Sequence, residues 1–294
     1  MNVLVCGAGG FVGRAACDAL RRRGHRVLAG RSSASTRADA VATDFVLDVD
    51  PATWLPRLAG IDAVVNTVGV LRDSRRRPIV AVHERVPRAL FDACAQAGVR
   101  RVVQVSALGI EGSRTAYART KRAADEALLA HVAAGRLDGV VLRPSVVFGR
   151  GGASSEMFLA LARLRVLLLP GAVRRTRVQP VAVRELGEAI ARLVDGPPPH
   201  EPLLAAVGPA PIALGDFIAS LRAQAGRAPA RVGTLPGPLA RWSARVGDAV
   251  PVSPWCSETL ALLESDNVAD PAPFERVLAR HATRFDHLLE EPAA

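Results

Sequence analysis

The chain has 294 residues, 49% of them hydrophobic, which is enough for one sizeable core or for a main domain with a smaller lobe. The formal net charge is +10, but the arginines are spread along the chain rather than gathered in a basic tract with interleaved aromatic residues, so no nucleic-acid partner is expected. Cys6, Cys17, Cys94 and Cys256 show no pairing rhythm and no C-x-x-C spacing, which argues against a disulfide framework and a zinc or other metal site.

No stretch of the sequence has the length and apolar character of a membrane-spanning helix. The densest apolar segment, residues 157–169, is interrupted by Arg163 and Arg165 and is too short to span a bilayer. The chain opens on a strand-like run without the charged and apolar regions of a signal peptide. We therefore expect a cytoplasmic protein with no transmembrane segment, while peripheral membrane association and the oligomeric state stay open.

The first expected element is a strand that runs into a glycine-rich turn. Residues 2–6 are followed by Gly7-Ala-Gly-Gly10-Phe-Val-Gly13 and then by an apolar-periodic helix over residues 15–20. Glycines at these positions allow a tight turn, close approach of a pyrophosphate to the helix N-terminus, and close packing of helix on strand. Strand, turn and helix together favour dinucleotide binding.

The end of the second expected strand bears on the choice of cofactor. This strand, residues 25–30, is followed by Arg31, where an NAD-preferring protein usually has an acidic residue for the ribose 2′-hydroxyl. A guanidinium at this position can pair with a 2′-phosphate instead. The sequence favours NADP over NAD, and the alternative role of Arg31 is that of an ordinary surface arginine.

Four more strands are expected in the first half of the chain, at residues 44–48, 62–69, 101–106 and 139–143. They alternate with helical segments, so we expect an α/β fold with a doubly wound, parallel sheet of the Rossmann type. Ligands of such sheets bind outside the carboxyl ends of the strands. This rule places near the cofactor Asp48, Thr67, Val68, Gly69 and Ser106.

The only tyrosine and the only lysine of the chain lie four residues apart, at Tyr117 and Lys121. All other basic side chains among the 38 lysines and arginines are arginines, so the surviving lysine is expected where a guanidinium cannot replace it. On a helix over about residues 116–130 both side chains share one face. A nearby cation lowers the pKa of a phenol, so we expect an acid–base pair, with an ordinary half-buried tyrosine and a solvated lysine as the alternative.

The proline-rich segment Gly196-Pro-Pro-Pro199 marks an expected boundary. Residues 1–196 would form the nucleotide-binding domain, with a substrate-lobe insertion at about 150–177. Residues 197–294 would form a small, mainly helical substrate lobe, with helices at residues 214–225, 238–246, 257–264 and 273–289.

Four features in this order resemble the extended and atypical short-chain dehydrogenase/reductases: the glycine turn, Ser106, Tyr117-x-x-x-Lys121 and Arg143-Pro-Ser-Val-Val-Phe-Gly149. Two later segments, Val178-Gln-Pro-Val-Ala-Val183 and Leu262-Leu-Glu-Ser-Asp-Asn267, are similar to one branch of that family. That branch contains the NAD(P)-binding accessory subunit of respiratory complex I and its bacterial relatives. The resemblance covers nearly the whole chain and is strongest up to about Ala191.

The resemblance implies roles for individual residues. Tyr117 would exchange a proton with the substrate oxygen, and Lys121 would bind the nicotinamide ribose and tune Tyr117. Arg31 would contact the adenosine ribose, Asp48 the adenine, and Pro144 the nicotinamide. The pyrophosphate would be held by Gly7, Gly10, Phe11, Val12 and Gly13.

The catalytic hydroxyl is less directly assigned by the resemblance. The family usually has a serine pair or triplet where this chain has Val105-Ser-Ala107. We assign the hydroxyl to Ser106, with the position of Ala107 as the alternative.

The leading functional hypothesis is an NADP-dependent oxidoreductase that transfers a hydride between nicotinamide and a carbonyl or alcohol carbon of a small molecule. One alternative is a non-catalytic NAD(P)-binding protein with a structural or redox-sensing role. Another is a nucleotide-sugar epimerase or dehydratase, against which Arg31 and the short gap from Ser106 to Tyr117 count. The lone tyrosine and lysine favour the oxidoreductase, since the glycine turn alone would suffice for binding.

Overall fold

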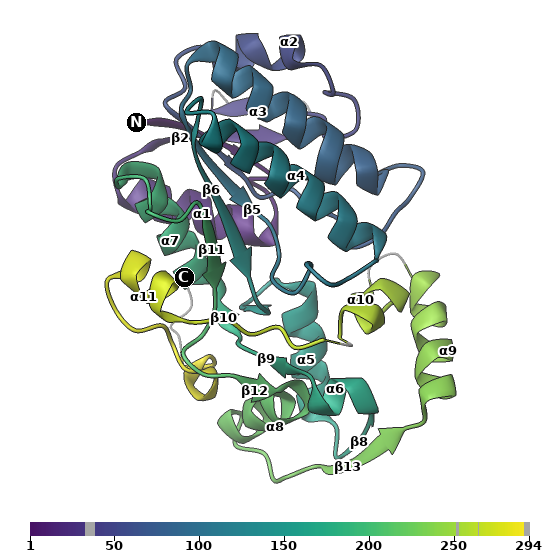
Figure 1. Cartoon of the computed structure of the whole chain (residues 1–294). Helices are drawn as coiled ribbons and strands as arrows, with labels where there is room; N and C mark the ends of the chain where they lie inside the picture. Colours follow the sequence, from purple (N-terminus) through teal and green to yellow (C-terminus); the bar gives the residue numbers. More distant parts are fainter. Residues whose placement is uncertain (33–38, 251–252, 264, 291–294) are drawn as a thin grey trace.

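A seven-stranded parallel sheet forms the centre of the computed structural model, which describes residues 1–32, 39–250, 253–263 and 265–290 (Figure 1). The strand order is β11-β6-β5-β4-β1-β2-β3. The strands are β1 (Asn2–Cys6), β2 (Arg26–Arg31), β3 (Ala40–Ala42), β4 (Ala63–Asn66), β5 (Arg101–Val105), β6 (Asp138–Pro144) and β11 (Leu203–Ala206). The expected doubly wound α/β fold of the Rossmann type is confirmed.

Helices cover both faces of this sheet. One face packs against α1 (Phe11–Arg22), α7 (Val183–Asp195) and α11 (Ala272–Leu278). The other packs against α2 (Pro51–Trp54), α3 (Val86–Ala97) and α4 (Ala116–Ala133). Because both faces are covered, the central strands are continuous apolar runs such as Val3-Leu-Val-Cys6, whose members are fully buried.

A smaller lobe lies beyond the carboxyl ends of the strands, in the lower half of Figure 1. Its core contains Phe148, Phe158 and Phe217, whose rings meet edge to face at centroid distances of 5.7 and 5.9 Å. Its helices are α5 (Ala153–Arg163), α6 (Gly171–Arg175), α8 (Leu214–Gln224), α9 (Gly237–Asp248) and α10 (Ser257–Leu262). Its strands are β7 (Val147–Phe148), β8 (Val166–Pro170), β9 (Arg177–Val178), β10 (Val181–Ala182), β12 (Ile212–Ala213) and β13 (Arg231–Leu235).

The strand expected at residues 44–48 is wrong, because two carboxylates there hold the backbone in a turn. Asp44 accepts hydrogen bonds from the amides of Val46 and Leu47, at 2.8 and 3.2 Å, and Asp48 accepts one from the amide of Asp44 at 2.5 Å. Aspartates that bind nearby amides in this way compete with strand pairing. The strand that pairs with the outer edge of β2 is β3, at Ala40–Ala42.

The last expected helix, residues 273–289, is confirmed at its start but is much shorter than expected. Helix α11 ends at Leu278, and Ala279 follows with a left-handed φ of 55°. The helix expected at residues 257–264 is α10, which ends at Leu262, and Glu264 lies outside the described residues.

The segment that follows the expected boundary near residue 196 returns to the seven-stranded sheet. Strand β11 pairs in parallel with β6, and α11 packs against α7. The division into two domains at that point stays a prediction. Among the described residues, no helix combines the length and the apolar character needed to cross a membrane.

Candidate active site

The glycine turn after β1 is a cradle that side chains would fill. Gly7 has a left-handed φ of 80°, and its carbonyl accepts a hydrogen bond of 2.8 Å from the amide of Gly10. A Cβ on Gly13 would lie 2.0 Å from the Gly7 carbonyl oxygen and 2.9 Å from Oγ1 of Thr67. The backbone conformation and packing of the turn therefore require glycine at these positions, whether or not a ligand is bound.

The amino-terminal end of α1 fits an anionic group. Gly10 caps this helix without a side-chain hydrogen bond, and its first turn contains no acidic residue. The free amides and the helix dipole favour a phosphate at such a position. Phe11 lies in the same turn, beside Gly149 and Gly152 of the loop after β7, and Val12 packs on the core under the sheet. The cradle thus fits the pyrophosphate of a dinucleotide.

The carboxyl end of β4 forms the wall next to this cradle. Thr67 donates a hydrogen bond of 2.8 Å from Oγ1 to the carbonyl of Cys6, and Val68 lies against Gly7. Gly69 follows, and a Cβ there would lie 3.6 Å from both Nζ of Lys121 and Nε2 of His83. The structure brings these predicted residues together with the glycine turn.

Three other predicted cofactor residues lie at the same edge of the sheet. Arg31 is exposed at the end of β2. Asp48 is buried, and its carboxylate accepts hydrogen bonds of 2.5 and 3.2 Å from the guanidinium of Arg57. Pro144 ends β6, and its carbonyl accepts a hydrogen bond of 2.9 Å from the amide of Leu108. The Asp48 carboxylate is therefore already bound by Arg57, whereas the Arg31 side chain is exposed to solvent.

Tyr117 and Lys121 both lie on the first turns of α4, as expected from their spacing. Thr115 caps this helix through a hydrogen bond of 3.1 Å that its Oγ1 accepts from the amide of Ala118. Lys121 is only 4% exposed, and its ammonium donates a hydrogen bond of 3.0 Å to the carbonyl of Val105. Tyr117 is half-buried. The lone lysine is thus an interior group rather than a solvated one.

His83 is a member of this site that the sequence analysis missed. It lies in one turn of π-helix, Ala81–Arg85, ahead of α3, and its ring meets that of Tyr117 edge to face at 5.3 Å. Its Nε2 accepts a hydrogen bond of 2.9 Å from the amide of Val70. Its Nδ1 lies 3.2 Å from Oγ1 of Thr120, which gives its own proton to the carbonyl of Ala116. The network therefore fixes a neutral imidazole with its proton on Nδ1.

Burial dominates the ionisation of these groups. It lowers the pKa of His83 to about 2, with the Lys121 charge adding to the shift, and lowers the pKa of Lys121 to about 8. Burial together with the nearby Asp125 raises the pKa of Tyr117 to about 12. This is opposite to the expected lowering by Lys121. The phenol is therefore protonated at neutral pH in the protein alone.

Asp125 is a second group that the sequence analysis missed, and it anchors a buried polar network behind Lys121. It is fully buried, and its Oδ2 accepts hydrogen bonds from Oγ of Ser106 at 2.7 Å and from Nε of Arg143 at 2.9 Å. Arg143 also pairs with Glu111. Burial raises the pKa of Asp125, while Ser106 and Arg143 act in the opposite direction. The sequence does contain a sign of this contact, because Asp125 follows Lys121 by four residues and so lies on the same helix face.

Ser106, the predicted catalytic hydroxyl, is 5% exposed and directs its proton to Asp125. The structure therefore places Ser106 in the buried network beside α4. Its assignment as the catalytic hydroxyl stays a prediction.

The smaller lobe closes over this edge of the sheet. Arg72, in the loop after β4, donates hydrogen bonds to the carbonyls of Gly247, Asp248 and Val250 at 2.8, 3.2 and 3.0 Å, and also bonds to Ser253. Glu258 of α10 accepts a hydrogen bond of 3.4 Å from the amide of Tyr117. The end of α9 therefore lies beside the loop after β4, and α10 lies beside the first turn of α4.

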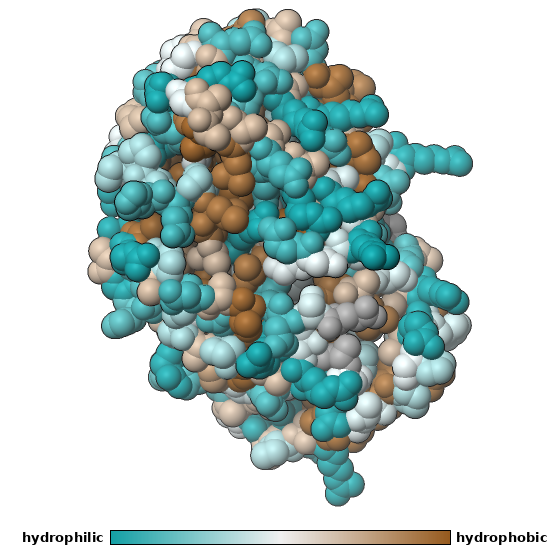
Figure 2. Space-filling view, in the orientation of Figure 1, coloured by the Kyte–Doolittle hydropathy of each residue, from teal (hydrophilic) through white to brown (hydrophobic). Residues whose placement is uncertain are grey.

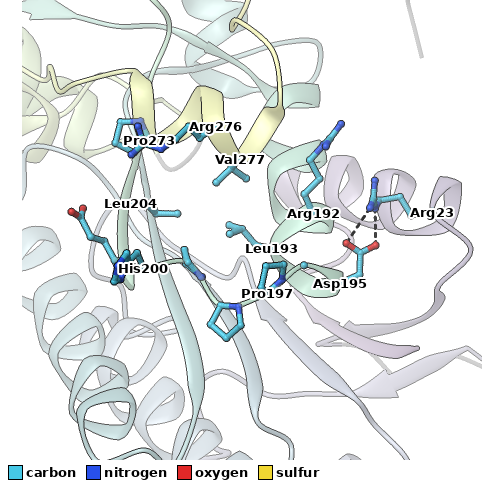
Figure 3. Close-up of a pocket in the computed structure, with 14 residues that line it drawn as sticks. Arg23, Arg192, Leu193, Asp195, Pro197, His200, Leu204, Pro273, Arg276 and Val277 are labelled. Carbon is cyan, nitrogen blue, oxygen red and sulfur yellow. Dashed lines mark hydrogen bonds and ion pairs between the residues drawn. The ribbon is translucent and has the colours of Figure 1, made fainter.

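A pocket of about 830 Å³ lies at the opposite, amino-terminal end of the sheet (Figure 3). It is lined by the end of α7, by Pro197, Pro198 and Pro199, and by Pro273 and Val277 near α11. Arg23 and Asp195 form an ion pair of 2.7 Å at its rim. This pocket is not part of the site around Tyr117. In the part of the chain that the structure describes, no cluster of three or more histidine, cysteine or acidic side chains is arranged to hold a metal ion.

With this geometry in place, the chain belongs to the NAD dependent epimerase/dehydratase family, which its residues 3–173 match. It is 29% identical over 177 residues to the 2-alkyl-3-oxoalkanoate reductase of Stenotrophomonas maltophilia, covering 51% of this chain and 52% of that protein. It is 25% identical over 201 residues to the mitochondrial NADH dehydrogenase [ubiquinone] 1 alpha subcomplex subunit 9 of Rattus norvegicus, covering 67% of this chain and 51% of that protein. The chain thus spans about half the length of these relatives.

The fold is also shared with solved structures. The NADPH-dependent quinone oxidoreductase QOR2 of Escherichia coli, solved with NADPH, superposes with a TM-score of 0.71 at 16% identity, covering 99% of each chain. This likeness supports the fold. The predicted resemblance to the extended short-chain dehydrogenase/reductases and to the branch of the complex I subunit is confirmed.

Proposed function

We propose that this chain is an NADP-dependent reductase of ketones, in which Tyr117 gives a proton to the carbonyl oxygen. One observation carries the proposal: Lys121 is buried beside Gly69 and His83 at the carboxyl edge of the sheet, next to Tyr117 and the glycine cradle. A protein that only binds a nucleotide needs the cradle, but it does not need a buried lysine and a phenol in this place.

The residues present fit a dinucleotide. The glycine turn and the amino-terminal amides of α1 would hold the pyrophosphate, and Lys121 would reach the nicotinamide ribose past Gly69. Arg31, exposed at the end of β2, would pair with a 2′-phosphate, which supports NADP. The bound nicotinamide supplies the hydride.

The protonation states favour reduction over oxidation. At neutral pH the phenol of Tyr117, with a pKa raised to about 12, holds its proton and can donate it to a carbonyl oxygen. Lys121, with a pKa lowered to about 8, is still mainly charged there. An ammonium beside the tyrosine stabilises the phenolate that remains after proton transfer.

The proposed substrate is a ketone carried on an alkyl chain. The bacterial relative is named for an oxoalkanoate, and this similarity supports the same class here. Arg72 is not proposed as a substrate ligand, because its guanidinium is occupied by backbone carbonyls of the smaller lobe.

The test combines cofactor binding with turnover. Fluorescence titration should show tighter binding of NADPH than of NADH, and Arg31→Ala should remove most of that preference. Long-chain 3-oxoacyl substrates should then oxidise NADPH in the wild type, while Tyr117→Phe should lose this activity and keep its affinity for NADPH. Equal affinity for the two cofactors in the wild type would reject NADP, and an unchanged rate in Tyr117→Phe would reject the role of Tyr117.

The similarity to the complex I subunit favours a second candidate, a NAD(P)-binding protein without turnover. The same experiment separates the two functions. NADPH binding with no oxidation across a panel of carbonyl compounds would favour the binding protein.

A further inference from the structure

Helix α9 carries an apolar face that the rest of the chain leaves uncovered. Its residues Ala240, Ala244 and Gly247 are buried against the lobe, and a Cβ on Gly247 would lie 2.0 Å from the carbonyl oxygen of Trp255. The exposed fractions of its larger apolar side chains are 52% for Leu239, 65% for Trp242 and 48% for Val246. The helix thus has one apolar side packed on the protein and a second that faces solvent.

The spacing of these exposed residues defines a single stripe. Leu239, Trp242 and Val246 occur at positions i, i+3 and i+7, which lie on one face of a helix. The small residues that face the protein occupy a different side of the same helix. A helix that is packed on the protein along one side and carries large apolar residues along an exposed side is suited to contact with a second apolar surface, such as a bilayer interior.

The two strands of the lobe that pair ahead of α9 also carry exposed apolar side chains. Parallel strands β8 and β13 pair with each other, and β13 leads directly into α9. Among the described residues, eight of the thirteen exposed large hydrophobic side chains belong to this region: Leu164, Val166, Leu168, Val232, Leu239, Trp242, Val246 and Val250. In the view of Figure 2, the lower half of the molecule shows scattered brown atoms among teal and white ones.

The side chains around the stripe are mainly positively charged, which favours a negatively charged partner surface. The segment from Gly226 to Val250 holds four arginines and one acidic residue, Asp248. The carboxylate of Asp248 is occupied by the amide and hydroxyl of Ser257, at 2.9 and 2.6 Å. Arg241 and Arg245 are exposed on α9 itself, and Arg163 and Arg165 flank the apolar residues that lead into β8. Tryptophan and leucine bordered by arginine are the composition of helices that lie in the interface of anionic bilayers.

We propose that α9, with the adjoining β8–β13 strands, docks on an anionic lipid bilayer, with Leu239, Trp242 and Val246 in the acyl region and Arg241 and Arg245 at the headgroups. The helix would lie in the plane of the interface and would not cross the membrane. This inference does not depend on the proposed reductase activity, because it rests on the outer surface of the lobe.

The position of α9 gives the docking a direct link to the site. Arg72 binds carbonyls at the carboxyl end of α9, and α10 reaches the amide of Tyr117. A bilayer under α9 would therefore lie close to the edge of the sheet where the cofactor and a substrate are expected.

Sedimentation with vesicles tests the proposal on the full chain. Vesicles of phosphatidylcholine and phosphatidylglycerol in equal parts should bind the wild type, and vesicles of phosphatidylcholine alone should bind it about tenfold more weakly. The triple variant Leu239→Ser, Trp242→Ser, Val246→Ser should reduce binding to the mixed vesicles by about tenfold or more. Arg241→Gln with Arg245→Gln should have an effect of about tenfold and should weaken the dependence on salt.

Two control variants test whether the loss of vesicle binding is specific to the apolar residues of α9. Leu47→Ser and Val80→Ser remove apolar side chains that are 74% and 41% exposed elsewhere, and they should leave vesicle binding unchanged. NADPH affinity and the unfolding midpoint of every variant report on folding. A fluorescence readout is available in a Trp255→Phe background, where the emission of Trp242 should shift to the blue on binding while the buried Trp54 contributes a constant signal.

Three outcomes would overturn the proposal. The first is wild-type protein that sediments with neither kind of vesicle. The second is equal binding to both kinds of vesicle, which removes the role of charge. The third is a dimer in analytical ultracentrifugation that the triple variant dissociates, without vesicle binding by the wild type. That result would assign the stripe to contact with a second copy of the chain.

Discussion

The hydroxyl of Ser106 donates a hydrogen bond of 2.7 Å to Asp125, which lies one helical turn beyond Lys121. Its proton is therefore directed toward a buried carboxylate. Asp125 also accepts a hydrogen bond from Nε of Arg143, so Ser106 and Arg143 together hold this carboxylate of α4 in place. The contact changes what a substitution of Ser106 is expected to do.

Ser106→Ala should lower stability and leave turnover nearly intact. The buried carboxylate would lose one partner, which costs about 1 to 2 kcal/mol. Chemical denaturation and steady-state kinetics measure the two effects separately. Ser145→Ala is the matched control, because Ser145 is also buried and hydrogen-bonded, at the end of the adjacent strand β6. A fall in kcat by about a hundredfold with unchanged NADPH affinity would instead establish Ser106 as the catalytic hydroxyl.

Lys121→Arg should reduce kcat by about a hundredfold or more, although the charge is retained. The ammonium is buried against the carbonyl of Val105 and faces Gly69 and His83, so a larger planar guanidinium has no room in the same position. Arg119→Lys, the reverse exchange at an exposed position of the same helix, should be silent. Full activity in Lys121→Arg would show that any cation at this position is sufficient.

Gly13→Ala should destabilise the protein by about 1 to 3 kcal/mol and abolish NADPH binding, because the added methyl group overlaps the Gly7 carbonyl oxygen. Gly9→Ala is the control within the same turn, since a Cβ there would meet nothing within 4 Å. Thermal unfolding without cofactor compares the two variants. Equal unfolding temperatures for Gly13→Ala and the wild type would contradict the close approach of α1 to β1.

His83 should make the protein sensitive to mild acid. Its pKa is lowered from 6.5 to about 2 in the folded chain, so below pH 6.5 the unfolded chain takes up a proton that the folded chain does not. Stability should therefore fall as the pH drops from 6.5, and this group contributes a loss of about 2 kcal/mol by pH 5. Urea unfolding at pH 7 and pH 5 measures the loss.

The variant His83→Asn provides the comparison, because it keeps a hydrogen-bond acceptor and cannot titrate in this range. It should be less stable than the wild type at pH 7, yet lose less stability between pH 7 and pH 5. The same loss in both proteins would mean that His83 is already able to bind a proton in the folded chain.

The parts of the site that the sequence predicts well are those with a local cause. The glycine turn can be predicted from local sequence, because Gly7 and Gly13 are required by close contacts within one strand, turn and helix. Tyr117 and Lys121 are predicted to share a face because i and i+4 do so on any helix. The arginine-rich composition then shows that this lysine is unusual.

The parts that it misses depend on contacts between distant segments. His83 belongs to the site because Val70 and Thr120 hold its two nitrogens, and neither contact is visible in the residues around it. The expected lowering of the Tyr117 pKa considered Lys121 alone, whereas burial of the phenol and the charge of Asp125 act in the other direction. The strand expected at residues 44–48 fails for a local reason, because the carboxylates of Asp44 and Asp48 accept hydrogen bonds from nearby amides and hold this segment in a turn.

Strand β11 gives the chain a particular weakness to truncation and proteolysis. It follows the proline-rich segment, yet it covers the outer edge of β6, from Leu203 beside Val141 to Ala206 beside Pro144. A fragment ending at residue 196 would keep the glycine cradle and α4 with Tyr117 and Lys121, but it would expose the unpaired backbone edge of β6 to solvent. Exposed strand edges of this kind pair with other chains, so such a fragment is expected to aggregate rather than to form a minimal enzyme.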